Sequence, residues 1–163
     1  MGVHELDGAM VVSPFRPSQT LSNILRTKNL VINLTDDVRV FAGSLTGRHD
    51  WAVQLADRVD GHRLVDALSH IEAVLTHVKD DDLRPRLFCQ EVFREYHRPF
   101  LGFNRAQAAV IEGAILVSRL HLLSREKVEA EMKYLSAAVI KTAGPREREA
   151  WGWLHEAVFE KRA

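Results

Sequence analysis

The chain has 163 residues, with 22 Lys and Arg against 22 Asp and Glu, so its formal net charge is +0. This length suits one domain, or one domain with a small appendage, and a hydrophobic fraction of 46% is that of a globular protein. The neutral balance argues against nucleic-acid binding, which needs a basic stripe, and against a polybasic membrane-surface binder. The single cysteine, Cys89, excludes an intrachain disulfide.

No segment of the sequence predicts a membrane span. The most apolar stretch, residues 106–118, is interrupted by Glu112 and followed by Arg119, and it is too short to cross a bilayer. The N-terminus carries Glu5 and Asp7 where a signal peptide would be neutral or basic. We therefore expect a cytoplasmic protein that binds neither membranes nor nucleic acid.

The first third of the chain predicts mixed strands and short helices. Asp7-Gly8 is a favoured hairpin turn between the apolar runs Val3–Leu6 and Ala9–Phe15. Three further elements are expected: a helix with Leu21, Ile24 and Leu25 on one face, a strand over Leu30–Leu34, and a helix with Val38, Phe41, Ala42 and Leu45 on one face.

The middle of the chain is ambiguous by periodicity alone. Leu64, Leu68 and Ile71 approximate a helical period, yet residues 71–76 also fit a strand. We expect a short helix over residues 61–69, followed by two antiparallel strands.

The last 60 or so residues predict three helices. Asn104 can cap the first, which extends to about residue 120, and Ser124 can cap the second. Gly144 is a natural helix stop and Pro145 a natural first residue of the third helix. Trp151, Leu154 and Val158 form the expected apolar face of that helix.

The stretch from Arg16 to Asn23 carries the clearest chemical signal, and two interpretations of it stay open. It lies between a strand end and a helix start, where free amides, hydroxyls and one guanidinium make a good phosphate receptor. Alternatively, Ser18 or Thr20 simply caps the helix and Arg16 is a solvated charge.

Other chemistry-bearing residues point less clearly to a site. The eight histidines include no pair at i, i+4, so we predict no metal site. Cys89 lies in an apolar run, where a cysteine is usually a small buried hydrophobe. The segment from Phe100 to Arg105 either borders a flat ligand or forms a hydrophobic staple with an N-cap. No catalytic residue can be named.

Four stretches together resemble a family catalogued as domain of unknown function 447. They are Val12–Thr20, Val31–Val38, Phe100–Ala106 and Thr142–Trp153. The family is similar to the flavin-reductase-like split β-barrel, a Greek-key fold that binds FMN at a dimer interface. The resemblance implies an α+β protein with a split β-barrel flavin-binding domain over residues 1–100 and a C-terminal helical segment over residues 101–163. It also favours strands in the middle region.

The resemblance further implies where FMN would bind. Its phosphate would lie against four residues of the strand–turn–helix that contains Arg16 to Asn23. The flavin ring would lie beside the end of the following strand. A third stretch would reach the cofactor from the second copy of a homodimer. These residues are Arg16, Ser18, Thr20 and Asn23 at the phosphate, Asn33, Leu34 and Thr35 by the flavin, and Phe103, Asn104 and Arg105 across the dimer.

One departure from the family concerns the N-terminus. Family members usually begin with a strand ahead of an Ala-Pro-Met-Gly segment, whereas this chain begins at Met1-Gly2. We therefore expect the first barrel strand to be absent, either because the start was assigned too late or because this is a shortened variant. The loss of that strand would weaken the prediction of FMN binding.

The resemblance implies two functions of different kinds. One is an FMN-dependent oxidoreductase that takes electrons from NAD(P)H and acts in one-carbon or pterin-related metabolism. The other is a non-catalytic, dimeric flavin-binding or protein-interaction module. The sequence identifies neither the electron donor nor the acceptor.

Overall fold

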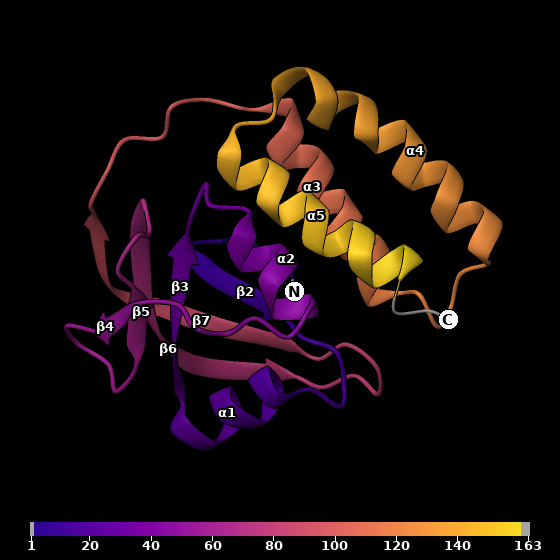
Figure 1. Cartoon of the computed structure of the whole chain (residues 1–163). Coiled ribbons are helices and arrows are strands. Elements are labelled where there is room, and N and C mark those ends of the chain that lie inside the picture. The colour runs from indigo at the N-terminus through magenta and orange to yellow at the C-terminus, as the bar shows by residue number, and fades with distance from the viewer. Residues whose placement is uncertain (1, 161–163) are drawn as a thin grey trace. The chain divides into compact units, whose positions relative to one another are not determined.

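The computed structural model describes residues 2–160 as an α+β protein (Figure 1). By their contacts the elements form two units. The sheet unit comprises the residues up to 35 together with 52–99, and the helical unit comprises 36–51 together with those from 100 onward. The expected division near residue 100 stays a prediction, but the segment 36–51 packs with the later helices.

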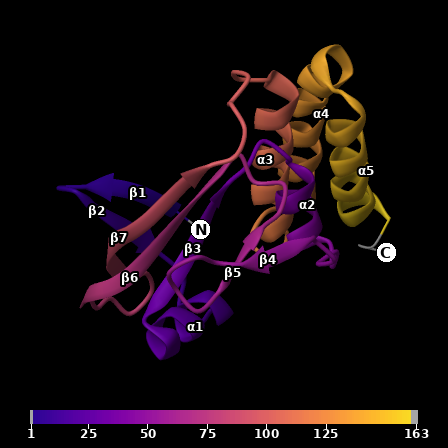
Figure 2. The same ribbon diagram turned by 90° about the vertical axis from the view of Figure 1, so that its left-hand side faces the viewer.

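The sheet unit contains seven strands and one helix. In chain order they are β1 (Gly2–Leu6), β2 (Ala9–Ser13), α1 (Gln19–Thr27), β3 (Asn29–Leu34), β4 (Val53–Leu55), β5 (His62–Leu64), β6 (Ser69–Lys79) and β7 (Arg86–Tyr96). Five strands form an antiparallel sheet of order β1-β2-β7-β6-β3, and β4 pairs with β5. Figure 2 shows α1 lying against this sheet near β3.

The predicted first hairpin, helix and strand are confirmed. Asp7 and Gly8 have φ angles of 50° and 77°, the positive values that a two-residue type I′ turn requires. Helix α1 buries Leu21 and Ile24 against the sheet, in a core that also contains Val12, Ala73, Leu87 and Cys89.

The two long strands β6 and β7 were expected, and they form the centre of the sheet. Their register shifts between Glu72 and Ala73 and again between Leu75 and His77. Each shift is a β-bulge or similar irregularity, which bends the strands and increases their twist. The sheet therefore curls.

The predicted helix over residues 61–69 is wrong. This segment instead contains β5 and the first residue of β6. Its amides find partners outside the segment, because Leu64 N donates to Asn33 Oδ1 at 2.8 Å and Val65 N donates to Ala52 O at 2.9 Å. Leu64 lies in β5, Leu68 in an irregular segment and Ile71 in β6, and all three are buried or half-buried. Their spacing therefore resembles a helical period although no helix is present in this segment.

The helical unit contains α2 (Arg39–Leu45), α3 (Arg105–Ser118), α4 (Arg125–Thr142) and α5 (Pro145–Phe159). The three later helices were predicted, and they lie side by side in both views (Figure 1 and Figure 2). Asn104 and Ser124 cap α3 and α4 through their side chains, and Gly144 is the N-cap of α5. One hydrophobic core cluster of this unit contains Val38, Ala42, Val110, Ala114, Val128, Met132, Ala150, Leu154 and Val158, and a second contains Ala106, Ala109, Ala138, Val139 and Ala143.

Within residues 2–160, no helix combines the length and the apolar character that crossing a bilayer requires.

Candidate functional site

The loop between β2 and α1 places the residues predicted at the phosphate. Ser18 is the N-cap of α1, and its Oγ accepts a hydrogen bond from Leu21 N at 3.3 Å. Thr20 lies in the first turn of the helix, where backbone amides point out of the helix end. Asn23 lies one turn further, and its Oδ1 accepts from Gln19 Nε2 at 3.0 Å. Arg16, Ser18, Thr20 and Asn23 thus follow one continuous strand–turn–helix.

Arg16 is held beside the turn that joins β6 to β7. Its backbone N donates to Leu83 O at 3.0 Å, and its guanidinium pairs with Asp80 Oδ1 at 2.8 Å. Both side chains are exposed, at 43% for Arg16 and 76% for Asp80, so this ion pair is worth little in water. The guanidinium can therefore exchange Asp80 for another anion at small cost.

Charged side chains of both signs belong to the same turn, where three cations face three aspartates. A shallow depression of about 190 Å³ is lined by Lys79, Asp80, Asp81, Arg84 and Arg86. The Arg84 guanidinium lies 3.9 Å from the centre of the Phe15 ring, one residue before Arg16. Hydrogen bonds from the backbone N–H groups of Arg84 and Leu83 hold the pKa of Asp81 below its usual value. The sequence did not indicate that this turn lies beside Arg16, because the pairing of β2 with β7 brings the two segments together.

The residues predicted beside the flavin lie at the end of β3. The side chain of Asn33 accepts a hydrogen bond from Leu64 N at 2.8 Å, so it ties β3 to β5. Leu34 is exposed at 42%, and its carbonyl accepts from Leu68 N at 2.8 Å. Thr35 follows directly and is half-buried. All three belong to the sheet unit, as do the residues of the β2–α1 loop.

The third predicted stretch belongs to the helical unit. Phe103 is fully exposed, and its ring meets that of Phe100 edge to face, with the ring centroids 5.3 Å apart. Asn104 acts as the predicted N-cap, because its Oδ1 accepts from Ala106 N at 2.8 Å. Arg105 begins α3 and is exposed.

A buried polar cluster in the sheet unit was missed by the sequence analysis. His70 and Glu72 on β6 are both 0% exposed, and His97 follows β7. His70 Nε2 lies 3.1 Å from Glu72 Oε1, while His70 Nδ1 lies 3.0 Å from His97 Nε2. Two histidines 27 residues apart show no spacing signal, although His70 and Glu72 at i, i+2 were detectable as one face of a strand.

The carboxylate of Glu72 is enclosed by backbone donors. It accepts from the N–H groups of Asp57, Arg58 and Val59 at 2.7, 2.7 and 2.9 Å. Burial alone would raise the pKa of Glu72, but these three donors and His70 outweigh it and hold the pKa below its usual value. Glu72 is therefore a buried carboxylate anion.

Two groups in this cluster have the spacing of metal ligands. Within residues 2–160 they are His70 with Glu95 and His97, and Asp57 with His70 and Glu72. The expectation that the chain has no metal site therefore stays a prediction.

Cys89 is fully buried within β7, as the sequence indicated. Burial raises the pKa of its thiol to about 11, so the thiolate is scarce at neutral pH. This environment does not suit a nucleophile.

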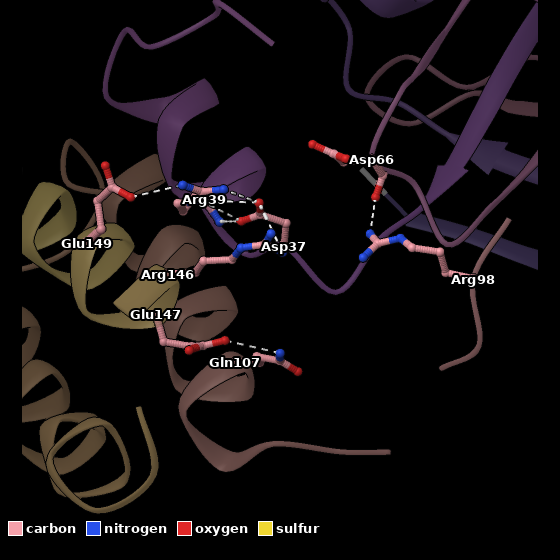
Figure 3. A network of polar contacts seen from close by, with 8 residues as sticks. All are labelled: Asp37, Arg39, Asp66, Arg98, Gln107, Arg146, Glu147 and Glu149. Carbon is pink, nitrogen blue, oxygen red and sulfur yellow. Dashed lines mark hydrogen bonds and ion pairs between the residues drawn. The ribbon is translucent and has the colours of Figure 1, made fainter. Parts of the chain in front are cut away.

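A charged network in the helical unit fixes the start of α2 (Figure 3). The carboxylate of Asp37 accepts from the backbone N of Arg39 at 3.1 Å and from its Nη2 at 2.6 Å. Arg39 Nη1 also reaches Glu149 of α5 at 3.1 Å, and Arg146 Nη1 lies 3.9 Å from Asp37. The network joins α2 to α5, which is a structural role.

The curled antiparallel sheet with its helices is the split β-barrel fold of the flavin reductases. Solved structures of this fold include 2-nitrobenzoate 2-nitroreductase from Pseudomonas fluorescens, at 20% identity and a TM-score of 0.50 over 59% of this chain and 53% of that one. The NADH:FAD oxidoreductase SgcE6 from Streptomyces globisporus C-1027 aligns at 7% identity and a TM-score of 0.50, over 58% of this chain and 63% of that one.

The chain belongs to the protein family of unknown function DUF447. The model of the family's N-terminal domain matches residues 1–98, and a second DUF447 model matches residues 104–156. The FMN-bound DUF447 protein MM1853 from Methanosarcina mazei aligns at a TM-score of 0.83 and 19% identity, over 96% of this chain and 85% of that one. Among curated protein sequences no match was found.

Proposed function

We propose that this chain is an FMN-binding flavoprotein. The observation that carries the proposal is the match to an FMN-bound structure of the same family, which aligns with 96% of this chain at a TM-score of 0.83. The alignment includes nearly the entire sheet unit and helical unit, and both parts of the chain match the family models.

The residues of the β2–α1 loop fit the phosphate of FMN. A dianionic phosphate needs several donors, and the loop offers the first-turn amides of α1, the hydroxyls of Ser18 and Thr20 and the guanidinium of Arg16. Asn23 lies one turn further along α1. The turn between β6 and β7 also brings Lys79, Arg84 and Arg86 near Arg16, and its three aspartates, Asp80, Asp81 and Asp82, balance their charge.

The other predicted residues would contact the flavin ring. Asn33, Leu34 and Thr35 offer an amide, an apolar surface and a hydroxyl at the end of β3. Phe103, Asn104 and Arg105 would reach the cofactor from the second copy of a homodimer. The dimer and these contacts rest on the family resemblance.

Bound FMN supplies redox chemistry, since its ring accepts a hydride and passes electrons onward. We propose an NAD(P)H-linked oxidoreductase in one-carbon or pterin-related metabolism, located in the cytoplasm. The second candidate is a dimeric module that binds flavin without turnover. Oxidation of NADH or NADPH by the FMN-loaded protein separates them, because only the enzyme would turn over the nucleotide.

The experiment that tests flavin binding compares FMN with riboflavin, which lacks the phosphate. Purified protein is gel-filtered, examined for flavin absorbance, and titrated with each compound by fluorescence quenching. We expect FMN to bind about one per chain and riboflavin at least tenfold more weakly, because charge-assisted hydrogen bonds are each worth roughly 1.5–3 kcal/mol. Protein that is colourless and binds neither compound would contradict the proposal. Equal affinities for FMN and riboflavin would show that the β2–α1 loop does not bind the phosphate.

A further inference from the structure

The buried cluster of Glu72, His70 and His97 lies beside the residues proposed for the flavin, because His70 on β6 pairs with Asn33 on β3. Glu72 and His70 are 0% exposed, and the side chain of His97 is 16% exposed. The contacts run in series, with 3.1 Å from Glu72 Oε1 to His70 Nε2 and 3.0 Å from His70 Nδ1 to His97 Nε2. A chain of contacts thus leads from the interior of the sheet unit to a side chain that solvent can reach.

The chemistry of these groups assigns the protons. A carboxylate can only accept, so the contact with Glu72 requires the hydrogen of His70 on Nε2. When His70 is neutral its Nδ1 is bare, and the contact with His97 then requires the hydrogen of His97 on Nε2. It follows that neutral His97 has a bare Nδ1.

The ring geometry favours a shared proton over a shared metal ion. The ring planes of His70 and His97 are 6° from parallel and their centroids are 5.1 Å apart, although the two nitrogens are only 3.0 Å apart. The rings therefore meet edge to edge, with the two nitrogens directed at each other. Two imidazoles on one metal would instead direct their nitrogens at a third point.

The charges around His97 bear on its protonation. Burial lowers the pKa of His97 below its usual value, and the charge of Arg63 lowers it further. Glu95 and Asp57 act in the opposite direction without outweighing them. The nearest oxygen of Glu95 is 3.8 Å from Nδ1, beyond hydrogen-bond distance. His97 is therefore neutral at physiological pH.

We propose that Glu72, His70 and His97 form a directional hydrogen-bonded relay that presents Nδ1 of His97 as a proton-accepting site. The ligand it suits carries an N–H or O–H group, since a bare imidazole nitrogen accepts one hydrogen bond or one proton. A proton taken up at Nδ1 would be stabilised through His70 by the buried charge of Glu72. Glu72 and His70 are positioning residues, because they act only through His97.

The primary test is nitrogen NMR of the full-length protein labelled with ¹⁵N-histidine. At neutral pH we expect His70 and His97 each to show one tautomer with the hydrogen on Nε2. On acidification, Nδ1 of His97 should take up a proton before Nδ1 of His70 does. A hydrogen on Nδ1 of His97 at neutral pH, or a mixture of tautomers, would overturn the relay. This measurement needs no variant, so it stands even if a substitution prevents folding.

Two variants sharpen the test. In Glu72→Gln the amide can donate as well as accept, so His70 and His97 should lose their single tautomers. The matched control is Glu91→Gln, because Glu91 pairs with Arg94 on β7 and should leave both histidine spectra unchanged. Unchanged tautomers in Glu72→Gln would overturn the positioning role of Glu72.

Two reagents test the accepting nitrogen and the metal alternative. Diethyl pyrocarbonate attacks bare imidazole nitrogens, so mass spectrometry of the native protein should find His97 modified and His70 protected. An unmodified His97 would overturn the site. Added Zn²⁺ should leave the resonances of His70 and His97 unchanged, whereas stoichiometric shifts of both facing nitrogens would replace the relay with a metal site.

Discussion

The imidazole of His70 and the carboxylate of Glu72 lie two residues apart on β6, on the same face of the strand, and both are fully buried. A buried charge is costly unless hydrogen bonds replace its lost hydration. The carboxylate of Glu72 accepts such hydrogen bonds from His70 and from three consecutive backbone amides at residues 57–59. The pair therefore fixes the connection between β4 and β5 onto the central sheet.

Glu72→Gln should destabilise the protein by about 2 kcal/mol, since hydrogen bonds to a charged group are worth roughly 1.5–3 kcal/mol. The new amide would also turn an N–H group toward backbone donors. Urea unfolding measures this difference. Glu131→Gln is the matched control, because the contact of Glu131 with Lys127 is exposed and long, at 3.9 Å, and its loss should change stability by less than about 0.5 kcal/mol. Equal effects of the two substitutions would contradict this account.

Asp37→Asn should destabilise the helical unit in a pH-dependent manner. Burial raises the pKa of Asp37, but hydrogen bonds from Arg39 and the charge of Arg146 outweigh it and leave the pKa below its usual value. Because the folded-state pKa is lowered, the stability that the ionised Asp37 contributes is fully present above about pH 4. It is lost as the pH falls through the lowered value.

The difference in unfolding free energy between wild type and Asp37→Asn should therefore be about 2 kcal/mol at neutral pH and shrink in acid. Glu149→Gln is the control, since Glu149 is half exposed and should have a small effect at every pH. Urea unfolding at several pH values provides the measurement. A difference that is independent of pH would show that the charge of Asp37 is not the cause.

Arg16→Ala should weaken FMN binding about tenfold or more, because it removes a charge-assisted contact to the phosphate. Riboflavin binding should be unaffected, since no phosphate is present. Arg26→Ala removes a cation from the opposite end of α1 and serves as the control for net charge. Fluorescence titration measures the affinity of each of the two variants for FMN and for riboflavin. Unchanged FMN affinity in Arg16→Ala would exclude Arg16 from the site.

The thiol of Cys89 should be inert in the native protein. It is 0% exposed and its pKa is raised to about 11 by burial, so both access and thiolate are lacking. Ellman's reagent should give no rapid reaction until denaturant is added, and then one thiol per chain. Because Cys89 is the sole cysteine, rapid reaction of the native protein would contradict the burial directly.

Two glycines in neighbouring helices should respond in opposite ways to substitution by alanine. A Cβ at Gly113 would lie 3.1 Å from Trp151 Cζ3 and 3.2 Å from Leu154 Cδ1, so these two side chains of α5 would have to shift by a few tenths of an ångström. A Cβ at Gly152 would meet nothing within 4 Å.

Gly152→Ala should therefore raise the unfolding free energy by about 0.5–1 kcal/mol, the difference in helix propensity. In Gly113→Ala the crowding should offset that gain and produce net destabilisation of about 1 kcal/mol. Thermal or urea unfolding of the two variants makes the comparison. Stabilisation by both would contradict the close packing at Gly113.

Local signals made the helix ends and the first hairpin predictable. Asp7-Gly8, Asn104, Ser124 and Pro145 act on amides or backbone angles within a few residues, so their effect does not depend on the rest of the fold. The segment 61–69 was mistaken for a helix because its amides are satisfied from β3 and β4, which periodicity does not show.

The candidate site likewise combines features set by local sequence with contacts set by the tertiary fold. The sequence by itself determined the strand–turn–helix with Arg16, Ser18 and Thr20, since neighbours along the chain are enough to build it. Only the tertiary structure brought Asp80 to Arg16, 64 residues away, and His97 to His70, 27 residues away. The first contact depends on the antiparallel pairing of β2 with β7 and the second on that of β6 with β7, and strand pairing aligns residues that no local spacing relates.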